Sequence, residues 1–111
     1  MSNLNDAHMD CFENVCVKKK ANIYYDGKVS SRTIIFPDGS RKTLGIMLPG
    51  EYEFKTESKE QIELLQGNAY FKLPGSKGWK VFKGGDSLTI PPKSKFKVKV
   101  TEILDYCCSY K

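Results

Sequence analysis

Turn-forming residues recur along this chain at short, nearly regular intervals, and their spacing limits the possible folds more than any other feature. The stretches between them are short and rich in Val, Ile, Phe, Tyr and Thr, the residues that strands favour. The turn signals are Asp26-Gly27, Pro37-Asp38-Gly39, Pro49-Gly50, Gly67-Asn68, Pro74-Gly75, Gly84-Gly85-Asp86 and Pro91-Pro92. Short strands between frequent turns predict an all-β sandwich or barrel and exclude a helical or doubly wound fold.

The clearest strand is predicted over Ser94–Val100, where apolar residues alternate with Lys95, Lys97 and Lys99. A period of two places the apolar set on one face of a sheet and the lysines on the other. The lysine face could bind a polyanion or simply face water and protect a sheet edge. Because no aromatic residue alternates with these lysines to stack on bases, the solvent-exposed face is the favoured interpretation.

Two hairpins are predicted in the middle of the chain. Ala69–Leu73 and Trp79–Phe82 flank a loop at 74–78 and should pair with each other. The segment 60–66 also alternates as a strand does, and Gly67-Asn68 after it supplies the residues of a tight hairpin turn.

The length of 111 residues corresponds to one domain, with 40% apolar and 28% charged residues, as in ordinary soluble proteins. Residues 1–20 are predicted to form a polar, flexible N-terminal extension, and residues 21–111 the β-barrel domain. No apolar run approaches the roughly 18 residues of a membrane span. The first 13 residues also lack the pattern of a signal peptide, so we expect a cytoplasmic protein without a membrane partner.

The net charge of +5 fits either an anionic partner or a solubilising surface. The four cysteines do not form a zinc motif, because there is no C-x-x-C and the single histidine, His8, lies in the extension. Cys107 and Cys108 are neighbours on a predicted strand and should point to opposite faces. We therefore predict reduced thiols and no metal site.

The spacing of four residues, Glu60-x6-Gly67 and Gly85-x5-Pro91, is similar to the two motifs of cupins. In metal-binding cupins a His-x-His pair precedes the glutamate and a third histidine follows the proline. These positions hold Glu53 and Lys55, or Phe54 and Thr56, and then Phe96. Since none of these side chains replaces an imidazole ligand, the chain resembles a single, jelly-roll-like cupin β-barrel that needs no metal or other cofactor.

A narrower resemblance covers about residues 20–111. The stretch 41–56, RKTLGIMLPGEYEFKT, resembles the signature of the bacterial pyrimidine/purine nucleoside phosphorylases. The similarity continues through Leu73-Pro74, Trp79, Gly85, Pro91, Ser94, Phe96 and the ending Tyr106-Cys107-Cys108-Ser109-Tyr110, which carries one residue more than the family pattern. The resemblance implies a small cupin-fold homodimer that converts purine and pyrimidine nucleosides and phosphate to free base and ribose 1-phosphate.

Phosphorolysis requires groups that bind phosphate, hold the ribose and stabilise the departing base. Arg41 is the candidate for phosphate, because its planar guanidinium suits oxyanions; it could also be an ordinary surface arginine. Glu51 and Glu60 are the candidate catalytic residues, since a carboxylate can bind ribose hydroxyls and stabilise positive charge at C1′. At the position of the cupin ligand glutamate, Glu60 should face inward.

Aromatic side chains could hold the base, and the candidates are Tyr52, Phe54, Trp79 and Tyr106. Each could equally belong to the core. Stacking requires only a π-face and would allow broad base specificity. The general acid that protonates the departing base could be a tyrosine, a glutamate with raised pKa, or water, and the sequence does not distinguish these.

Three functions are compatible with these residues. The first is the metal-independent nucleoside phosphorylase, with nucleosides and inorganic phosphate as partners. The second is a non-enzymatic cupin that binds a small ligand. The third, a nucleic-acid-binding β-barrel, has only the charge and aromatic content in its favour and lacks an RNA-binding motif, so no nucleic-acid partner is predicted.

Overall fold

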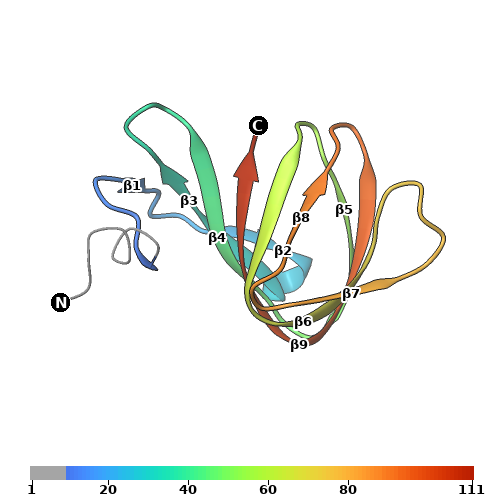
Figure 1. Ribbon diagram of the computed structural model, residues 1–111. Coiled ribbons are helices and arrows are strands. Elements are labelled where there is room, and N and C mark those ends of the chain that lie inside the picture. Colours follow the sequence, from blue (N-terminus) through green and yellow to red (C-terminus); the bar gives the residue numbers. More distant parts are fainter. Residues whose placement is uncertain (1–9) are drawn as a thin grey trace.

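The structure, a computed structural model, describes residues 10–111, and its regular elements are almost all strands (Figure 1). The strands are β1 (Cys16–Val17), β2 (Asn22–Tyr24), β3 (Val29–Ile35), β4 (Arg41–Met47), β5 (Gly50–Lys55), β6 (Glu60–Lys72), β7 (Lys80–Lys83), β8 (Ser87–Ile90) and β9 (Lys95–Tyr110). One 3-10 helical turn, η1 (Tyr25–Gly27), joins β2 to β3. The all-β prediction is confirmed.

The two longest strands, β6 and β9, bend and run through both halves of the molecule (Figure 1). In β6 the first part pairs with β8 and the second with β7, while β9 pairs with β5 over 95–100 and with β4 over 104–109. The bends divide one antiparallel sheet into two facing arms, as in a jelly roll. We call these the first arm, which contains β3, β4 and β8, and the second arm, which contains β5 and β7. The sheet itself is not closed into a complete barrel.

Gly67 marks the bend of β6. The register between β6 and β9 shifts three times between Leu64 and Ala69, which is the signature of β-bulges. Gly67 has φ +103°, and a side chain there would collide with the carbonyl of Ile103. The predicted hairpin turn at Gly67-Asn68 is therefore wrong: the positive φ that a turn would need serves a bulge inside one long strand.

The hydrophobic core lies between the arms and contains inward-facing residues from both. In the second arm Phe71 packs edge to face on Phe82, with ring centroids 5.3 Å apart, and stacks on Phe96 at 6.3 Å. Ile62, Leu64 and Leu104 face them from the first arm and are almost fully buried. This packing gives the site a rigid floor, because close-packed interiors deform little.

The predicted hairpin around 74–78 is confirmed, since β6 and β7 pair antiparallel across it. The alternation in β9 is also confirmed: Phe96, Val98 and Val100 are buried, while the three lysines are exposed on the outer face of the second arm. An aromatic residue does accompany these lysines, contrary to expectation. It comes from outside the strand, with the Lys99 ammonium 5.0 Å from the centre of the Trp79 ring.

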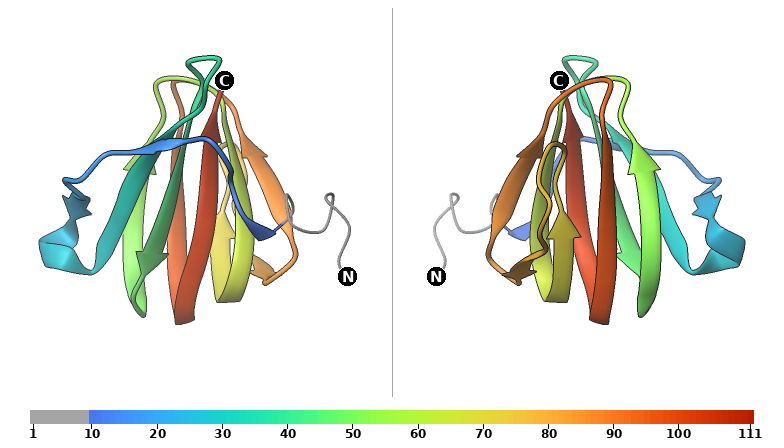
Figure 2. Two further views of the ribbon diagram at one scale, coloured as in Figure 1. Left: turned by 90° about the vertical axis from the view of Figure 1, so that its left-hand side faces the viewer. Right: turned by 90° about the vertical axis from the view of Figure 1, so that its right-hand side faces the viewer.

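The described part of the predicted extension, residues 10–20, runs along the first arm (Figure 2). In it, β1 pairs antiparallel with β3, and the Phe12 ring packs edge to face on Phe36 at 5.1 Å. His8 lies outside the described residues. Within residues 10–111, no helix has the length and apolar character needed to cross a membrane.

Candidate functional site

A cavity of about 240 Å³ lies between the inner faces of the two arms. This is slightly below the roughly 300–1,000 Å³ of typical small-molecule pockets, so only a small ligand fits inside. Its walls combine aromatic and polar groups. They are formed by Tyr24, Val29, Ser31, Met47, Phe54, Lys55, Glu60, Ile62, Phe96, Tyr106, Cys108 and Tyr110.

The polar wall of this cavity comes from the end of β9 and the start of β6. Tyr106, Cys108 and Tyr110 alternate along β9 and therefore share its inner face. The Cys108 thiol donates a hydrogen bond to Oε1 of Glu60 at 3.4 Å. The hydroxyls of Tyr110 and Thr43 hydrogen-bond to each other at 3.1 Å, which ties β9 to β4.

Burial keeps protons on these groups. Removal from water raises the pKa of Glu60, and the hydrogen bond from Cys108 offsets part of this effect. Burial also raises the pKa of Tyr106, Cys108 and Tyr110, and the proximity of Glu60 raises each of them further. The two phenols and the thiol are therefore neutral donors at physiological pH. Glu60 has the lowest ordinary pKa of the four groups and is therefore the one that loses its proton most readily.

Gly45 makes room for one of these donors. It lies in β4 opposite Tyr106, and a side chain at this position would lie 2.7 Å from the Tyr106 hydroxyl and would also collide with the carbonyl of Ser30. A glycine is therefore required for the Tyr106 ring to lie across β4 and reach the cavity.

Four of the predicted site residues meet at this cavity. Glu60, Phe54 and Tyr106 line it, and Glu60 faces inward as expected. Arg41 lies two positions before the buried Thr43 on β4 and thus on the same face. Its guanidinium carbon is 5.6 Å from the centre of the Tyr110 ring, which places a cation beside the cavity.

The other three predicted residues are not brought to the cavity wall. Glu51 is exposed and pairs with Lys99 on the outer face of the second arm. Trp79 also lies on that face, under the Lys99 ammonium. Tyr52 is buried in the core, where its hydroxyl donates to the carbonyl of Leu48 at 2.6 Å and its ring packs 6.3 Å from Phe54.

Sequence reasoning did not identify several lining residues. Period-two alternation from Tyr106 would have found Cys108 and Tyr110, because all three lie on one face of β9. No such signal points to Lys55, which follows the inward Phe54 at the end of β5 and also lines the cavity. The position of Tyr24 depends on the course of the chain before β3, which composition does not reveal.

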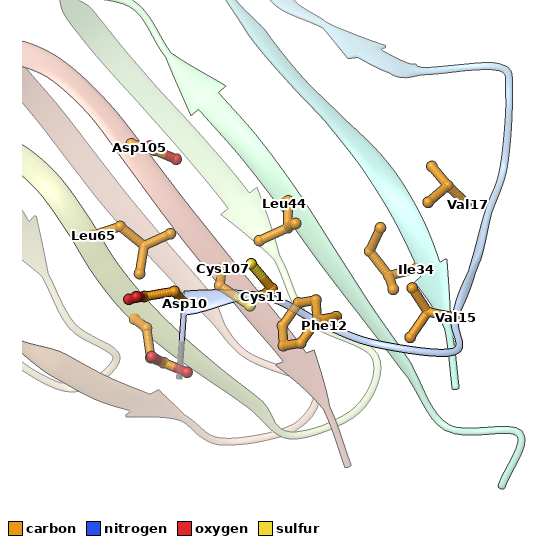
Figure 3. A pocket seen from close by; sticks show the side chains of 11 residues that line it. Asp10, Cys11, Phe12, Val15, Val17, Ile34, Leu44, Leu65, Asp105 and Cys107 are labelled. Atoms are coloured by element: carbon orange, nitrogen blue, oxygen red, sulfur yellow. The ribbon is translucent and has the colours of Figure 1, made fainter. Parts of the chain in front are cut away.

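A larger cavity, of about 550 Å³, lies on the outer face of the first arm (Figure 3). Cys11 and Phe12 of the N-terminal segment lie across Leu44 and Cys107 there. Its acidic groups, Asp10, Glu63 and Asp105, would repel an anion. Despite its smaller volume, the inner cavity has the better-matched chemistry for an anionic co-substrate, with Arg41 and Lys55 beside it.

The positions of the cupin histidine ligands that face the cavity hold phenylalanines, which do not bind metals. Phe54 and Phe96 face the inner cavity, and their ring centroids lie 5.5 Å apart. Cys107 and Cys108 lie on opposite faces of β9, as predicted, with one sulfur-bearing side chain on each cavity. Residues 10–111 contain no group of three His, Cys, Asp or Glu side chains arranged to hold a metal ion.

Comparison with known proteins identifies this chain's relatives. The family model for pyrimidine/purine nucleoside phosphorylase matches residues 19–110. A protein of that name from Leptospira interrogans serogroup Icterohaemorrhagiae serovar copenhageni is 57% identical over 102 residues, which cover 92% of this chain and 96% of the relative. The Clostridioides difficile (strain 630) protein of the same name is 55% identical over 92% of this chain and 97% of its own length.

Solved structures share the fold of this chain. An Acinetobacter sp. ADP1 protein of unknown function superimposes with a TM-score of 0.88 at 37% identity, covering 91% of this chain and 98% of that chain. An RmlC-like cupin from Shewanella frigidimarina NCIMB 400 superimposes with a TM-score of 0.66 at 15% identity, over 90% and 86% of the two chains, and shows that the fold is a cupin fold. With a family match over most of its length, this chain belongs to the pyrimidine/purine nucleoside phosphorylase family.

Proposed function

We propose that this protein is a nucleoside phosphorylase, a pentosyltransferase that cleaves the N-glycosidic bond of purine and pyrimidine nucleosides with inorganic phosphate. The observation that carries the proposal is the half-buried Glu60, with a raised pKa, in a cavity bordered by Arg41. Membership of a family whose members carry this name supports the same reaction.

In the proposed reaction a phosphate oxygen forms a bond to C1′ while the C1′–N bond breaks and its electron pair goes to the base. Glu60 donates its proton to the departing base, because burial favours the protonated carboxyl. The neutral hydroxyls of Tyr106 and Tyr110 offer further hydrogen bonds to base or ribose. Glu51, predicted with Glu60, has no role in this scheme because it lies on the outer face.

Arg41 and Lys55 bind the phosphate in this scheme. Both cations lie beside the inner cavity, Arg41 through its contact with Tyr110 and Lys55 through the cavity wall. A phosphate dianion in a partly dehydrated mouth requires such charges, since Coulomb attraction strengthens as water is excluded. In this scheme Phe54 binds the base, because its partly exposed ring lines the cavity and stacking does not select one base.

We also propose that the protein acts without a metal or other cofactor, as a homodimer in the cytoplasm, in nucleoside salvage and independently of membranes and nucleic acids. The non-ligand side chains at the cupin metal positions support the first part. The resemblance to small homodimeric phosphorylases supports the second.

The test is to incubate the purified protein with one purine and one pyrimidine nucleoside, with and without phosphate, and to measure free base by chromatography. We expect base release only with phosphate, and no change after treatment with a chelator. Saturable nucleoside binding without turnover would instead support the alternative, a non-enzymatic ligand-binding cupin. Activity that is lost on chelation and restored by a divalent ion would contradict metal independence.

A further inference from the structure

A short segment at the open edge of the first arm reaches across to the second arm. It consists of β2 and η1, residues 22–27, and we call it the strap. The strap pairs with β3 on one side, and it lies beside β5 in the right-hand view of Figure 2. It therefore spans the gap between the arms at the side where the sheet is not closed.

Tyr25 fastens the strap to β5. Its hydroxyl donates a hydrogen bond to the carbonyl of Glu53 at 2.6 Å and accepts one from the amide of the same residue at 3.0 Å. A neighbouring strand would make the same two bonds to an edge residue of a sheet. The Tyr25 ring packs on Tyr52 and Phe54, with centroid distances of 5.0 and 5.9 Å. One side chain thus substitutes for a missing strand.

The backbone of the strap is strained where this contact is made. Tyr25 and Asp26 have φ values of +51° and +55°, in the left-handed region that bulky residues avoid. Such strain persists where the surrounding structure compensates for it, and it is concentrated at functional sites. Here the compensation comes from the Tyr25 side chain, so its identity matters beyond the formation of a turn.

The fastened strap determines where Tyr24 lies. Tyr24 pairs with the buried Val29 and therefore projects from the inner face. It lines the inner cavity while 50% of its surface stays exposed, as expected for a residue at an entrance. Phe54, held edge-on by Tyr25, lines the same cavity. The Tyr25 contact thus fixes two aromatic walls, one from each arm.

We propose that Tyr24 contacts the base of the bound nucleoside and that Tyr25 is a positioning residue, which holds Tyr24 and Phe54 in place by binding the edge of β5. This inference rests on the proposed function, because it takes a nucleoside as the ligand. When the strap detaches, the entrance loses its aromatic wall, and the apparent affinity falls with the fraction of molecules in which the strap is closed.

The test compares Tyr25→Phe, which keeps the ring and removes both hydrogen bonds, with Tyr24→Ala. For both variants we expect the nucleoside KM to rise about 3- to 30-fold while kcat and the phosphate KM change less than about twofold. Titration calorimetry with nucleoside in the absence of phosphate should show the same rise in Kd. The double variant should bind less weakly than the sum of the two single effects predicts, because both changes act in part through Tyr24. Tyr70→Phe, on the outer face of the second arm, is the matched control.

A Tyr25→Phe protein with wild-type Kd, or one with reduced kcat and unchanged KM, would overturn the inference. A fall in melting temperature with unchanged nucleoside affinity would also overturn it, because it would show a structural role alone. If the wild-type protein binds nucleosides but releases no base, the proposed reaction fails while the Kd comparison still tests the strap. If the wild-type protein binds no nucleoside, both proposals fail.

Discussion

At the scale of single residues, the proposed acid–base chemistry of the inner cavity depends on Glu60. Its neighbours there are phenols and a thiol that burial keeps neutral, so no anion in the cavity competes with it for a proton. The same burial makes the ionised Glu60 unfavourable in the folded protein. Burial of Glu60 therefore favours the protonated form that the proposed reaction uses, but it lowers the stability of the folded protein when the carboxyl is ionised.

Replacing Glu60 by Gln should lower kcat by about 100- to 10,000-fold, the usual contribution of a general acid. In the wild type, kcat should fall as the pH rises through the raised pKa of Glu60, because only the protonated form donates. Steady-state phosphorolysis across pH measures both effects. Glu63→Gln, exposed on the outer face, is the control and should leave kcat unchanged. An active Glu60→Gln protein with an unchanged pH profile would assign the proton donation elsewhere.

The same substitution should change the pH dependence of stability. Because the pKa of Glu60 is higher in the folded chain than its ordinary value of 4.5, the folded state binds the proton more tightly. This contribution is complete below the unfolded pKa and is lost as the pH rises through the folded one. Urea unfolding should therefore show wild type losing stability over that window relative to Glu60→Gln. Parallel curves for the two proteins would contradict the burial argument.

Arg41→Ala should weaken phosphate binding without unfolding the protein. Loss of a charge-assisted pair costs on the order of 2–4 kcal/mol, or about 30- to 1,000-fold in kcat/KM for phosphate. Arg41→Lys should recover only part of the phosphate binding, because the lysine ammonium cannot make the two parallel hydrogen bonds of a planar guanidinium. The control is Arg32→Ala, whose exposed guanidinium donates to the carbonyl of Lys19. Wild-type phosphate kinetics in Arg41→Ala would shift the phosphate site towards Lys55.

At the scale of elements, residue patterns predicted strands better than they predicted connections. Alternation located the inner and outer faces of β9 because one face is buried and the other wet. The hairpin turn predicted at Gly67-Asn68 was wrong because a glycine with positive φ suits a turn and a β-bulge equally well. Only the strand that pairs with the segment distinguishes the two. Four of the seven candidate site residues lie at the cavity. Glu51 lies on the outer face because of the register of β5, and Trp79 lies there because of the course of the loop before β7. Neither feature can be predicted from the residue pattern.

The bend of β6 should depend on Gly67. Alanine there would adopt a strained positive φ and press against the carbonyl of Ile103, so Gly67→Ala should lower the free energy of unfolding by about 1–3 kcal/mol or more. Gly78→Ala is the matched control, since open space surrounds Gly78 and its φ is not positive. Urea denaturation measures both variants. Equal stability of the two would mean that the bend tolerates a side chain.

At the scale of the whole molecule, the two outer faces differ in character. The second arm presents Lys95, Lys97 and Lys99 to water, which discourages association. On the first arm Ile46 is exposed, and near the bend Leu65 and Ile103 are about half-exposed, at 49% and 54%. Groups of exposed apolar side chains on a small domain are typical of protein interfaces. Tyr70, Trp79 and Val81 are exposed on the second arm too, but Tyr70 and Trp79 lie beside Lys99. We therefore propose the first arm as the face that a second copy of the chain covers.

The proposed homodimer should therefore form through the first arm. A lysine in place of Leu65 would bury a charge at such an interface and should shift the mass measured by light scattering towards that of the monomer, 12.6 kDa. Val81→Lys is the control, because Val81 is 57% exposed on the second arm, away from this face. Both variants should unfold at similar urea concentrations, since neither side chain belongs to the core. A dimer that persists in Leu65→Lys and dissociates in Val81→Lys would place the interface on the lysine-bearing arm. A wild-type protein that is monomeric at all concentrations would contradict the dimer itself.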